Sequence, residues 1–210
     1  MLSPKVTGST GDDSLSAPRV TCQDGDVKHV FVSGDLALDF LGTLKWRRSD
    51  QEELLGSPTD LDAWIVEAGV LTTSPGSSGP DLDAATSLRE AVYALLRARL
   101  DGGEWPGPAL ETLNGWNNVP GPRTRLSPTG IEHVGDTSAA LAVVARSASH
   151  LLARPDIDSV KECANERCTR VFIDESRGSR RSWCGMAECG NRAKAAAYRA
   201  RRRTGADATP

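Results

Sequence analysis

Four cysteines that stand close together late in the chain constrain its fold more than any other feature of the sequence. Four residues separate Cys163 from Cys168, four separate Cys184 from Cys189, and fifteen lie between the two pairs. Two close pairs joined by a loop of this length let four thiolates converge on one tetrahedral ion. Zinc is the default ion for four sulfur ligands that have no redox task. We therefore predict one structural zinc ion held by Cys163, Cys168, Cys184 and Cys189.

Other interpretations of these cysteines stay open at this point: an iron–sulfur centre, disulfides, or coincidence. The four-residue spacer within each pair is wider than the commoner two-residue spacer. His29, His133 and His150 all lie outside the cysteine segment, so an all-cysteine site is the simplest arrangement. Four sulfurs leave no open position for water, so we expect the ion to hold the fold rather than to hydrolyse a substrate. Metal binding worth on the order of 10 kcal/mol would decide whether so small a segment folds.

Charge is distributed unevenly along the chain. The formal net charge of −3 over 210 residues argues at first against a nucleic-acid-binding protein. Residues 161–203, however, hold 12 basic and five acidic residues, a balance of +7, so the remainder carries −10. A concentrated basic region beside a metal site is typical of proteins that bind phosphate backbones. The alternative is that these cations belong to a solvated helix docked against the acidic remainder of the same chain.

The segment after Cys189 predicts a terminal helix rich in Ala and Arg. Gly190 and Asn191 can make its turn and N-cap, and on a helical wheel the alanines gather on one face while cations cover the rest. We predict that DNA is contacted by Arg180, Arg181, Arg192, Lys194, Arg199, Arg201, Arg202 and Arg203. Two side chains have a second interpretation: Arg192 can instead buttress the zinc site, and Trp183 can shield the metal or stack on a base.

The stretch before the cysteine segment predicts a helical domain with short β-hairpins. Apolar residues recur at three- and four-residue intervals between Leu82 and Leu100, which predicts the longest helix. Turn and capping residues predict the other helices. The first of these helices carries Leu36 to Leu44, and the second begins after Pro58 with Thr59 or Asp60 as its N-cap. A third begins near Pro108, and a fourth runs from Asp136 or Thr137 to Leu152.

Three short strand segments complete the expected secondary structure. The run from His29 to Val32 reads as a strand. Residues 123–134 read as a hairpin around a Ser-Pro-Thr-Gly turn, and residues 171–173 read as the second strand of a hairpin that begins near Val160. Residues 1–27 are rich in Ser, Gly, Asp and Thr without an apolar period, so we expect a disordered tail there.

The predicted fold class is therefore mainly α, of α+β type, in four parts. These are a disordered tail at 1–27, a helical domain at 28–155, a four-cysteine module at 156–204, and a disordered tail at 205–210. We expect the module to be a zinc-ribbon or treble-clef-like unit that ends in a basic helix. No apolar run is long enough for a membrane span or a signal peptide, so we expect a soluble, cytoplasmic protein.

The run Cys189-Gly190-Asn191-Arg192 resembles the motif that names the CGNR zinc-finger family. Other residues of that family's pattern stand in the expected order: Phe172, Asp174, Ser176, Arg181, Trp183, Cys184, Met186, Ala193 and Lys194. The segment from Gly34 to Thr43 looks like the opening motif of the ABATE domain, which precedes the zinc finger in that family. It departs from the motif at Gly42, where the family usually has Asn. The resemblance implies a bacterial, stress-induced transcription regulator that binds DNA and whose N-terminal domain senses a ligand or a protein partner.

Two functions from different classes follow. The first is a DNA-binding transcriptional regulator built on a structural zinc module; the alternative is a zinc-stabilised protein–protein interaction module that does not touch nucleic acid. We expect no enzyme, because the sequence has no Gly-rich phosphate loop, HExxH or GxSxG motif. Phe40, Trp46, Trp64 and Trp116 either pack in the core or line an effector pocket. A homodimer would double the phosphate contacts of so small a module.

Overall fold

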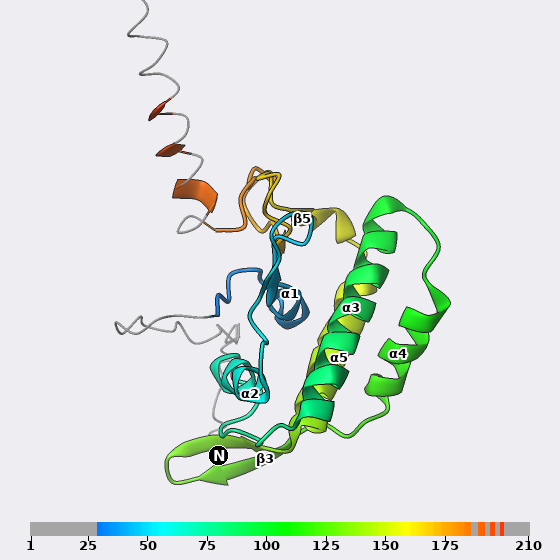
Figure 1. The fold of residues 1–210 in the computed structure, drawn as a ribbon, viewed down its shortest axis with the longest axis vertical. Helices are drawn as coiled ribbons and strands as arrows, with labels where there is room; N and C mark the ends of the chain where they lie inside the picture. Colours follow the sequence, from blue (N-terminus) through cyan, green and yellow to red (C-terminus); the bar gives the residue numbers. More distant parts are fainter. Residues whose placement is uncertain (1–28, 186–188, 192–193, 196–197, 200–210) are drawn as a thin grey trace, which may run out of the picture.

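The computed structural model of the chain describes residues 29–185, 189–191, 194–195 and 198–199 (Figure 1). The tails predicted at 1–27 and 205–210 lie outside these residues. Within the described ranges, none of the helices combines the length and apolar character that a membrane crossing requires.

Three helices form the frame of the body. α3 (Gly79–Asp101), α4 (Gly107–Asn117) and α5 (Thr137–Leu152) pack against one another, and Figure 1 shows α3 and α5 side by side with α4 on their flank. Asp136 caps α5 by accepting a hydrogen bond from the Ala139 amide at 2.8 Å. Gly102 ends α3 in the left-handed conformation (φ 68°), which glycine adopts without a steric penalty. The predicted helices in this region are confirmed.

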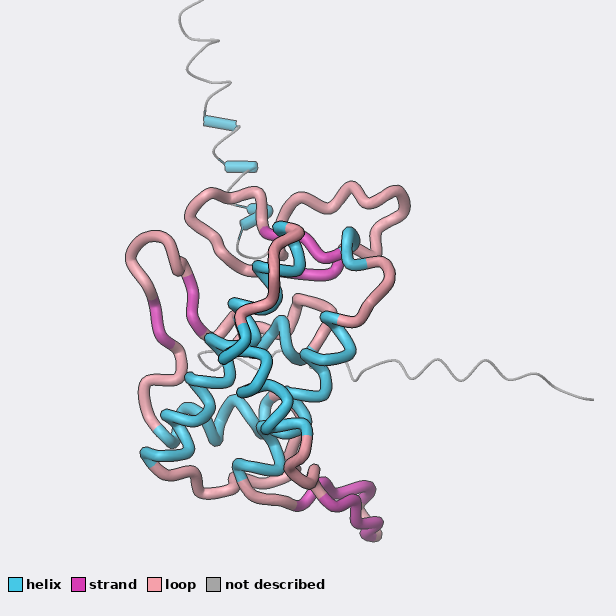
Figure 2. The backbone as a smooth tube through the Cα atoms, turned by 90° about the vertical axis from the view of Figure 1, so that its right-hand side faces the viewer, coloured by secondary structure: helices cyan, strands magenta, loops and turns pink. Residues whose placement is uncertain are grey.

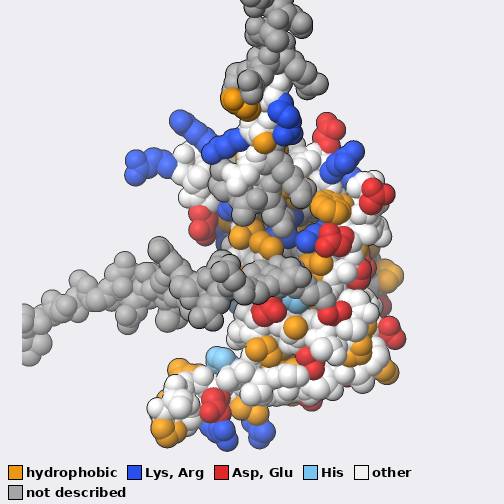
Figure 3. Space-filling model, turned by 60° about the vertical axis from the view of Figure 1, so that its left-hand side comes forward, with side chains coloured by type: hydrophobic (Ala, Val, Ile, Leu, Met, Phe, Trp, Pro, Cys, Tyr) orange, Lys and Arg blue, Asp and Glu red, His pale blue; other side chains and the backbone are white. Residues whose placement is uncertain are grey.

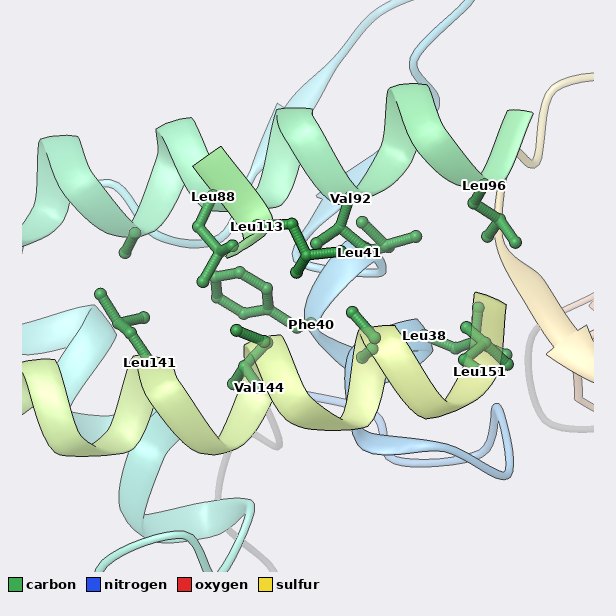
Figure 4. Close-up of a cluster of buried hydrophobic side chains, with 14 of the residues drawn as sticks. Leu38, Phe40, Leu41, Leu88, Val92, Leu96, Leu113, Leu141, Val144 and Leu151 are labelled. Atoms are coloured by element: carbon green, nitrogen blue, oxygen red, sulfur yellow. The ribbon is translucent and has the colours of Figure 1, made fainter. Parts of the chain in front are cut away.

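The core of the body is completed by α1 (Leu36–Leu41) and α2 (Pro58–Glu67). In Figure 4, Phe40 lies between α3 and α5 among the leucines and valines that both helices bury. The Phe40 ring packs on the Trp64 ring at a centroid distance of 4.9 Å. Because Phe40 and Trp64 are 0% and 1% exposed, both serve core packing rather than a pocket wall.

Three local predictions for residues 29–60 are wrong. Residues 29–32 form no strand: the Ser33 carbonyl accepts one hydrogen bond from the Ile173 amide (2.8 Å), too few for a ladder. The first helix ends at Leu41 rather than reaching Leu44. The N-cap of α2 is Ser57, whose hydroxyl accepts from the Asp60 amide (3.2 Å), because Pro58 occupies the first helical position.

In the described part of the chain, three separate two-stranded antiparallel sheets accompany the helices. β3 (Arg123–Ser127) and β4 (Gly130–Val134) form the hairpin predicted at 123–134, which projects from the body at the end opposite the cysteine module (Figures 1 and 2). The sequence did not indicate β1 (Leu44–Lys45) and β2 (Glu52–Glu53). A short 3₁₀ turn, η1 (Ile157–Ser159), then leads from α5 into β5 (Val160–Glu162), which pairs with β6 (Val171–Ile173) as predicted.

The β5–β6 hairpin belongs to two hydrophobic cores at once. Side chains alternate between the faces of a strand, so Val171 and Ile173 enter the core of the helical body together with Val160. Phe172, between them, packs instead among the four cysteines. All four apolar side chains are at most 4% exposed. The cysteine module is thus joined to the body by shared core packing as well as by the chain.

Candidate metal centre

The four predicted cysteine ligands come together in the structure. Their sulfur atoms all lie within 4.8 Å of one another, and all four residues are buried. Cys163 follows β5 directly, and its amide donates to the Arg170 carbonyl at 3.0 Å, so the hairpin positions the first ligand. Cys168 follows a tight turn in which its own amide donates to the Asn165 carbonyl at 2.7 Å.

The sulfur positions fit a tetrahedral zinc ion. Four Zn–S bonds of about 2.3 Å place neighbouring sulfurs roughly 3.8 Å apart, and the Cys168 and Cys184 Sγ atoms are 3.7 Å apart. A disulfide requires about 2.05 Å, and all four cysteines are free. Figure 2 shows the loops that carry them gathered at one end of the molecule beside β5 and β6. The geometry therefore favours a metal site over disulfides.

Electrostatics in the cluster also call for a cation. Hydrogen bonding from the Cys184 thiol is the main cause that lowers the pKa of Cys168, to about 5, so one thiolate forms readily. That hydrogen bond to Cys168 is also the main cause that raises the pKa of Cys184, with burial next. Burial, and after it the negative charge on Cys168, raises the pKa of Cys189 to about 12. Four thiolates this close need a divalent cation to balance their repulsion.

Side chains around the cysteines support the ligands and shield them. The Asn165 amide donates to the Cys189 sulfur at 3.7 Å, a contact that the sequence analysis missed although Asn165 lies in the spacer between two ligands. Phe172 and the half-buried Trp183 pack against the cysteine sulfurs. Trp183 therefore has the shielding role, the first of its two predicted interpretations, and its remaining exposed surface is open to solvent.

Arg181, one of the predicted DNA contacts, is largely engaged inside the protein. Its guanidinium lies over the Phe172 ring at 4.3 Å, its Nε donates to the Trp183 carbonyl at 2.9 Å, and its Nη2 donates to the Cys184 carbonyl. The same Nη2 donates to the Val32 carbonyl at 3.1 Å. Arg181 thus braces a ligand-bearing turn and ties the cysteine module to the segment that precedes α1.

Asp174 organises the loop that carries the predicted cations near position 180. Its carboxylate accepts hydrogen bonds from Lys161 Nζ (2.7 Å), the Ser176 hydroxyl (2.6 Å) and the Arg181 amide (3.0 Å). The Lys161 ammonium, followed by the Ser176 hydroxyl, holds the pKa of Asp174 well below its ordinary value. This carboxylate therefore stays charged and keeps the loop in place near neutral pH.

Further contacts dock the module on the body. Glu162 accepts hydrogen bonds from Arg48 (2.5 and 2.8 Å) and from Arg97 of α3 (2.9 Å). The Thr169 hydroxyl accepts from the Arg47 amide at 3.0 Å. In these ion pairs the acid belongs to the module and the arginines belong to the body. Arg170 and Arg181 of the module also donate to the Val30 and Val32 carbonyls of the body, whereas the exposed Arg180, Lys194 and Arg199 make no ion pair with it among the described residues.

Asp39 of α1 holds the segment that Arg181 also grips. Its carboxylate accepts hydrogen bonds from the Val32 and Ser33 amides at 3.1 and 3.0 Å. Burial is the main cause that raises the pKa of this carboxyl, and the two backbone hydrogen bonds partly oppose it. Asp39 therefore has a structural role, because it holds the backbone of the segment before α1.

The other predicted DNA contacts divide into two sets. Arg180, Lys194 and Arg199 are exposed, and the last two lie in helical backbone after Cys189. None of these three side chains makes an ion pair with the described part of the chain. The remaining four lie outside the described residues: Arg192, Arg201, Arg202 and Arg203.

Two comparisons with known proteins bear on this site. A family model described as "ABATE: Putative stress-induced transcription regulator" matches residues 34–155, and one described as "CGNR zinc finger" matches residues 159–202. No curated protein matches the chain. The zinc-finger match covers all four buried cysteines, so the prediction of a zinc cofactor is confirmed.

Proposed function

The chain belongs to the ABATE family of stress-induced transcription regulators and carries a CGNR zinc finger, and on this basis we propose that it binds DNA through the zinc module. The structural zinc would hold the module, and the arginines and lysine on its outer surface would contact phosphates. The body would position the module and take no direct part in sequence reading.

The observation that supports this proposal most directly is that three exposed cations of the module have no ion-pair partner in the described part of the chain. Arg180, Lys194 and Arg199 are exposed and have no acidic partner among the described residues. The module meets the body through apolar side chains of β5 and β6, through its own acid, Glu162, and through Arg170 and Arg181, which donate to backbone carbonyls. Docking of the cations against the acidic body, the alternative that the charge pattern left open, involves Arg170 and Arg181, which donate to backbone carbonyls of the segment before α1, but not these three exposed cations.

The distribution of charge gives DNA a defined side from which to approach. Figure 3 shows most of the Lys and Arg side chains of this face at the end of the molecule that carries the module, with a smaller group at the opposite end, whereas Asp and Glu side chains are spread over the whole face. The balance is +7 for residues 161–203 and −10 elsewhere. Long-range attraction would therefore orient the module, rather than the body, toward a phosphate backbone.

A salt titration tests whether the zinc-loaded protein binds DNA in this way. Four to six phosphate contacts predict a log–log slope of about −4 to −5 for the association constant against salt concentration. Fluorescence anisotropy with a labelled DNA duplex measures this slope. A slope near zero, or no binding at low salt, would contradict the proposal.

A truncation separates DNA binding from an interaction with a protein partner. Deleting residues 195–210 removes Arg199 and three further arginines while leaving all four zinc ligands in place. If the proposal is correct, DNA affinity falls and the melting temperature stays unchanged. Arg199→Ala is the smaller change, and Arg125→Ala, an exposed arginine on β3, is its matched control. Loss of stability without a change in DNA affinity would favour the protein-interaction function.

A further inference from the structure

A groove of about 490 Å³ lies between the zinc module and the segment that precedes α1. The described residues that line it are Val32, Arg180, Arg181, Ser182, Trp183 and Gly185. All but Val32 belong to the segment from Arg180 to Gly185, which contains Cys184. The groove therefore joins a residue of the body to the basic module, and neither the zinc site nor the docking contacts account for it.

Cationic and hydroxyl groups of the groove are positioned to bind an anion. Arg181 donates through Nε and Nη2 to backbone carbonyls, so its guanidinium is fixed in one orientation. Its Nη1 donates to no group in the described part of the chain. Arg180 and Ser182 are exposed beside it. A fixed guanidinium with an unused donor, next to a second arginine and a hydroxyl, suits a phosphate oxygen.

Apolar surface forms the rest of the groove. Val32 is 38% exposed, although it lies in a segment whose backbone is held by Asp39 and Arg181. Trp183 packs against the cysteine cluster and also lines the groove. An apolar wall beside hydrogen-bond donors that suit a phosphate matches the alternation of sugar and phosphate along a nucleic-acid strand. Inorganic phosphate alone would accept hydrogen bonds from these donors but would leave the apolar wall uncovered.

We propose that this groove takes the sugar–phosphate backbone of a DNA strand, so that Val32 of the body forms part of the DNA interface. Arg181 Nη1, Arg180 and Ser182 bind a phosphate, and Val32 and Trp183 pack against the adjoining sugar. This inference rests on the proposed function and extends it beyond the zinc module. DNA is favoured over an acidic protein segment because two arginines line the groove and residues 161–203, to which they belong, carry +7.

Charge substitutions at Val32 test the inference on the zinc-loaded full chain with a labelled duplex. Val32→Glu is expected to weaken DNA binding about fivefold or more, and Val32→Lys to tighten it, because the new charge lies within reach of a phosphate. Val134 is the matched control position: it is 37% exposed and lies on β4, away from the module. Val134→Glu and Val134→Lys are expected to change the affinity less than twofold. Zinc content and melting temperature are measured for every variant.

Arg180→Ala provides a second measurement that does not depend on adding a charge. Loss of one phosphate contact is expected to reduce the salt slope by about 1. Arg125→Ala on β3 removes the same charge far from the groove and is expected to leave the slope unchanged.

The outcomes separate this inference from the proposed function. If the wild-type protein does not bind DNA, the proposed function fails. If wild type binds but equal charges at Val32 and Val134 have equal effects, only the groove assignment is overturned. The groove assignment is also overturned if added inorganic phosphate, at matched ionic strength, abolishes the difference in DNA affinity between Val32→Glu and Val32→Lys. The groove would then bind a single phosphate ion rather than a DNA strand.

Discussion

Removal of zinc should destabilise the helical body as well as the cysteine module. The perturbation is chelation of the metal from the reduced protein, with Cys184→Ser as its genetic equivalent. The matched control is Cys22→Ser, at the fifth cysteine of the chain, which belongs to neither ligand pair and lies outside the described residues. Without zinc the repulsion among the buried thiolates is no longer balanced, and the hairpin that positions Cys163 loses its anchor. That hairpin also carries Val160, Val171 and Ile173 into the core of the body.

The size of the effect follows from this shared packing. Burial of a side chain such as Val or Ile contributes about 1.5–3 kcal/mol, so release of the three residues costs the body about 5–9 kcal/mol. Even half of that figure, to allow for burial already present in the unfolded chain, corresponds to a fall in melting temperature of roughly 5–18 °C. Domains of this size have only about 5–15 kcal/mol of stability in total.

Calorimetry and tryptophan fluorescence measure the effect together. Trp64 is 1% exposed and lies in the body core, so in a Trp183→Phe variant, which removes the tryptophan at the cysteine cluster, a red shift of the emission reports unfolding of the body. We expect one cooperative transition for the zinc-loaded protein and a lower melting temperature for the body after chelation. If the chelated protein keeps the original body transition and loses only a separate, small one, the argument from the shared hairpin is refuted.

The remaining predictions concern single residues of the module. Ile173→Ala should lower the free energy of unfolding by about 2–5 kcal/mol with zinc still bound, whereas Phe172→Ala, at a cost of about 3–5 kcal/mol, should also speed zinc transfer to a chromophoric chelator. Equal zinc-transfer rates would contradict the assignment of the two neighbours to different cores. Asp174→Asn should speed hydrogen exchange at the Arg181 amide. The pKa of Asp174 is held low by Lys161, so its contribution is complete above the unfolded value of about 3.9 and is lost only as pH falls through the lower folded value. The ratio of the Asp174→Asn exchange rate at the Arg181 amide to the wild-type rate should therefore be the same at pH 8 and pH 5. A ratio that falls to one near pH 6 would contradict this.

Much of the helical body could be predicted because its signals are local. The apolar spacing in α3 and the capping residue of α5 lie within a few residues of the positions they specify. The errors fall where long-range contacts decide the conformation. Residues 29–32 look like a strand, but their partners are side chains: the Glu67 and Asp39 carboxylates and the Arg170 and Arg181 guanidinium groups. No local sequence pattern indicates such partners.

The predicted DNA contacts show the same limit. In the sequence, Arg180 and Arg181 are equivalent neighbours in a basic run. In the structure, Arg180 is exposed, while Arg181 stacks on Phe172 and reaches Val32, which lies 149 positions earlier in the chain. Charge counting recognises the cations of a region, but it does not distinguish those that face solvent from those that hold the fold.

The sequence by itself determined the metal donors and the electrical polarity of this protein. The spacing of Cys163, Cys168, Cys184 and Cys189 leaves few ways to satisfy four thiolates, and charge is additive along a chain. Only the tertiary structure decided that the β5–β6 hairpin serves two cores, and that Val32 of the body and the zinc module enclose one groove. The physical reason is that burial and hydrogen-bond partners depend on which distant segments meet, and this is set by packing of the whole chain.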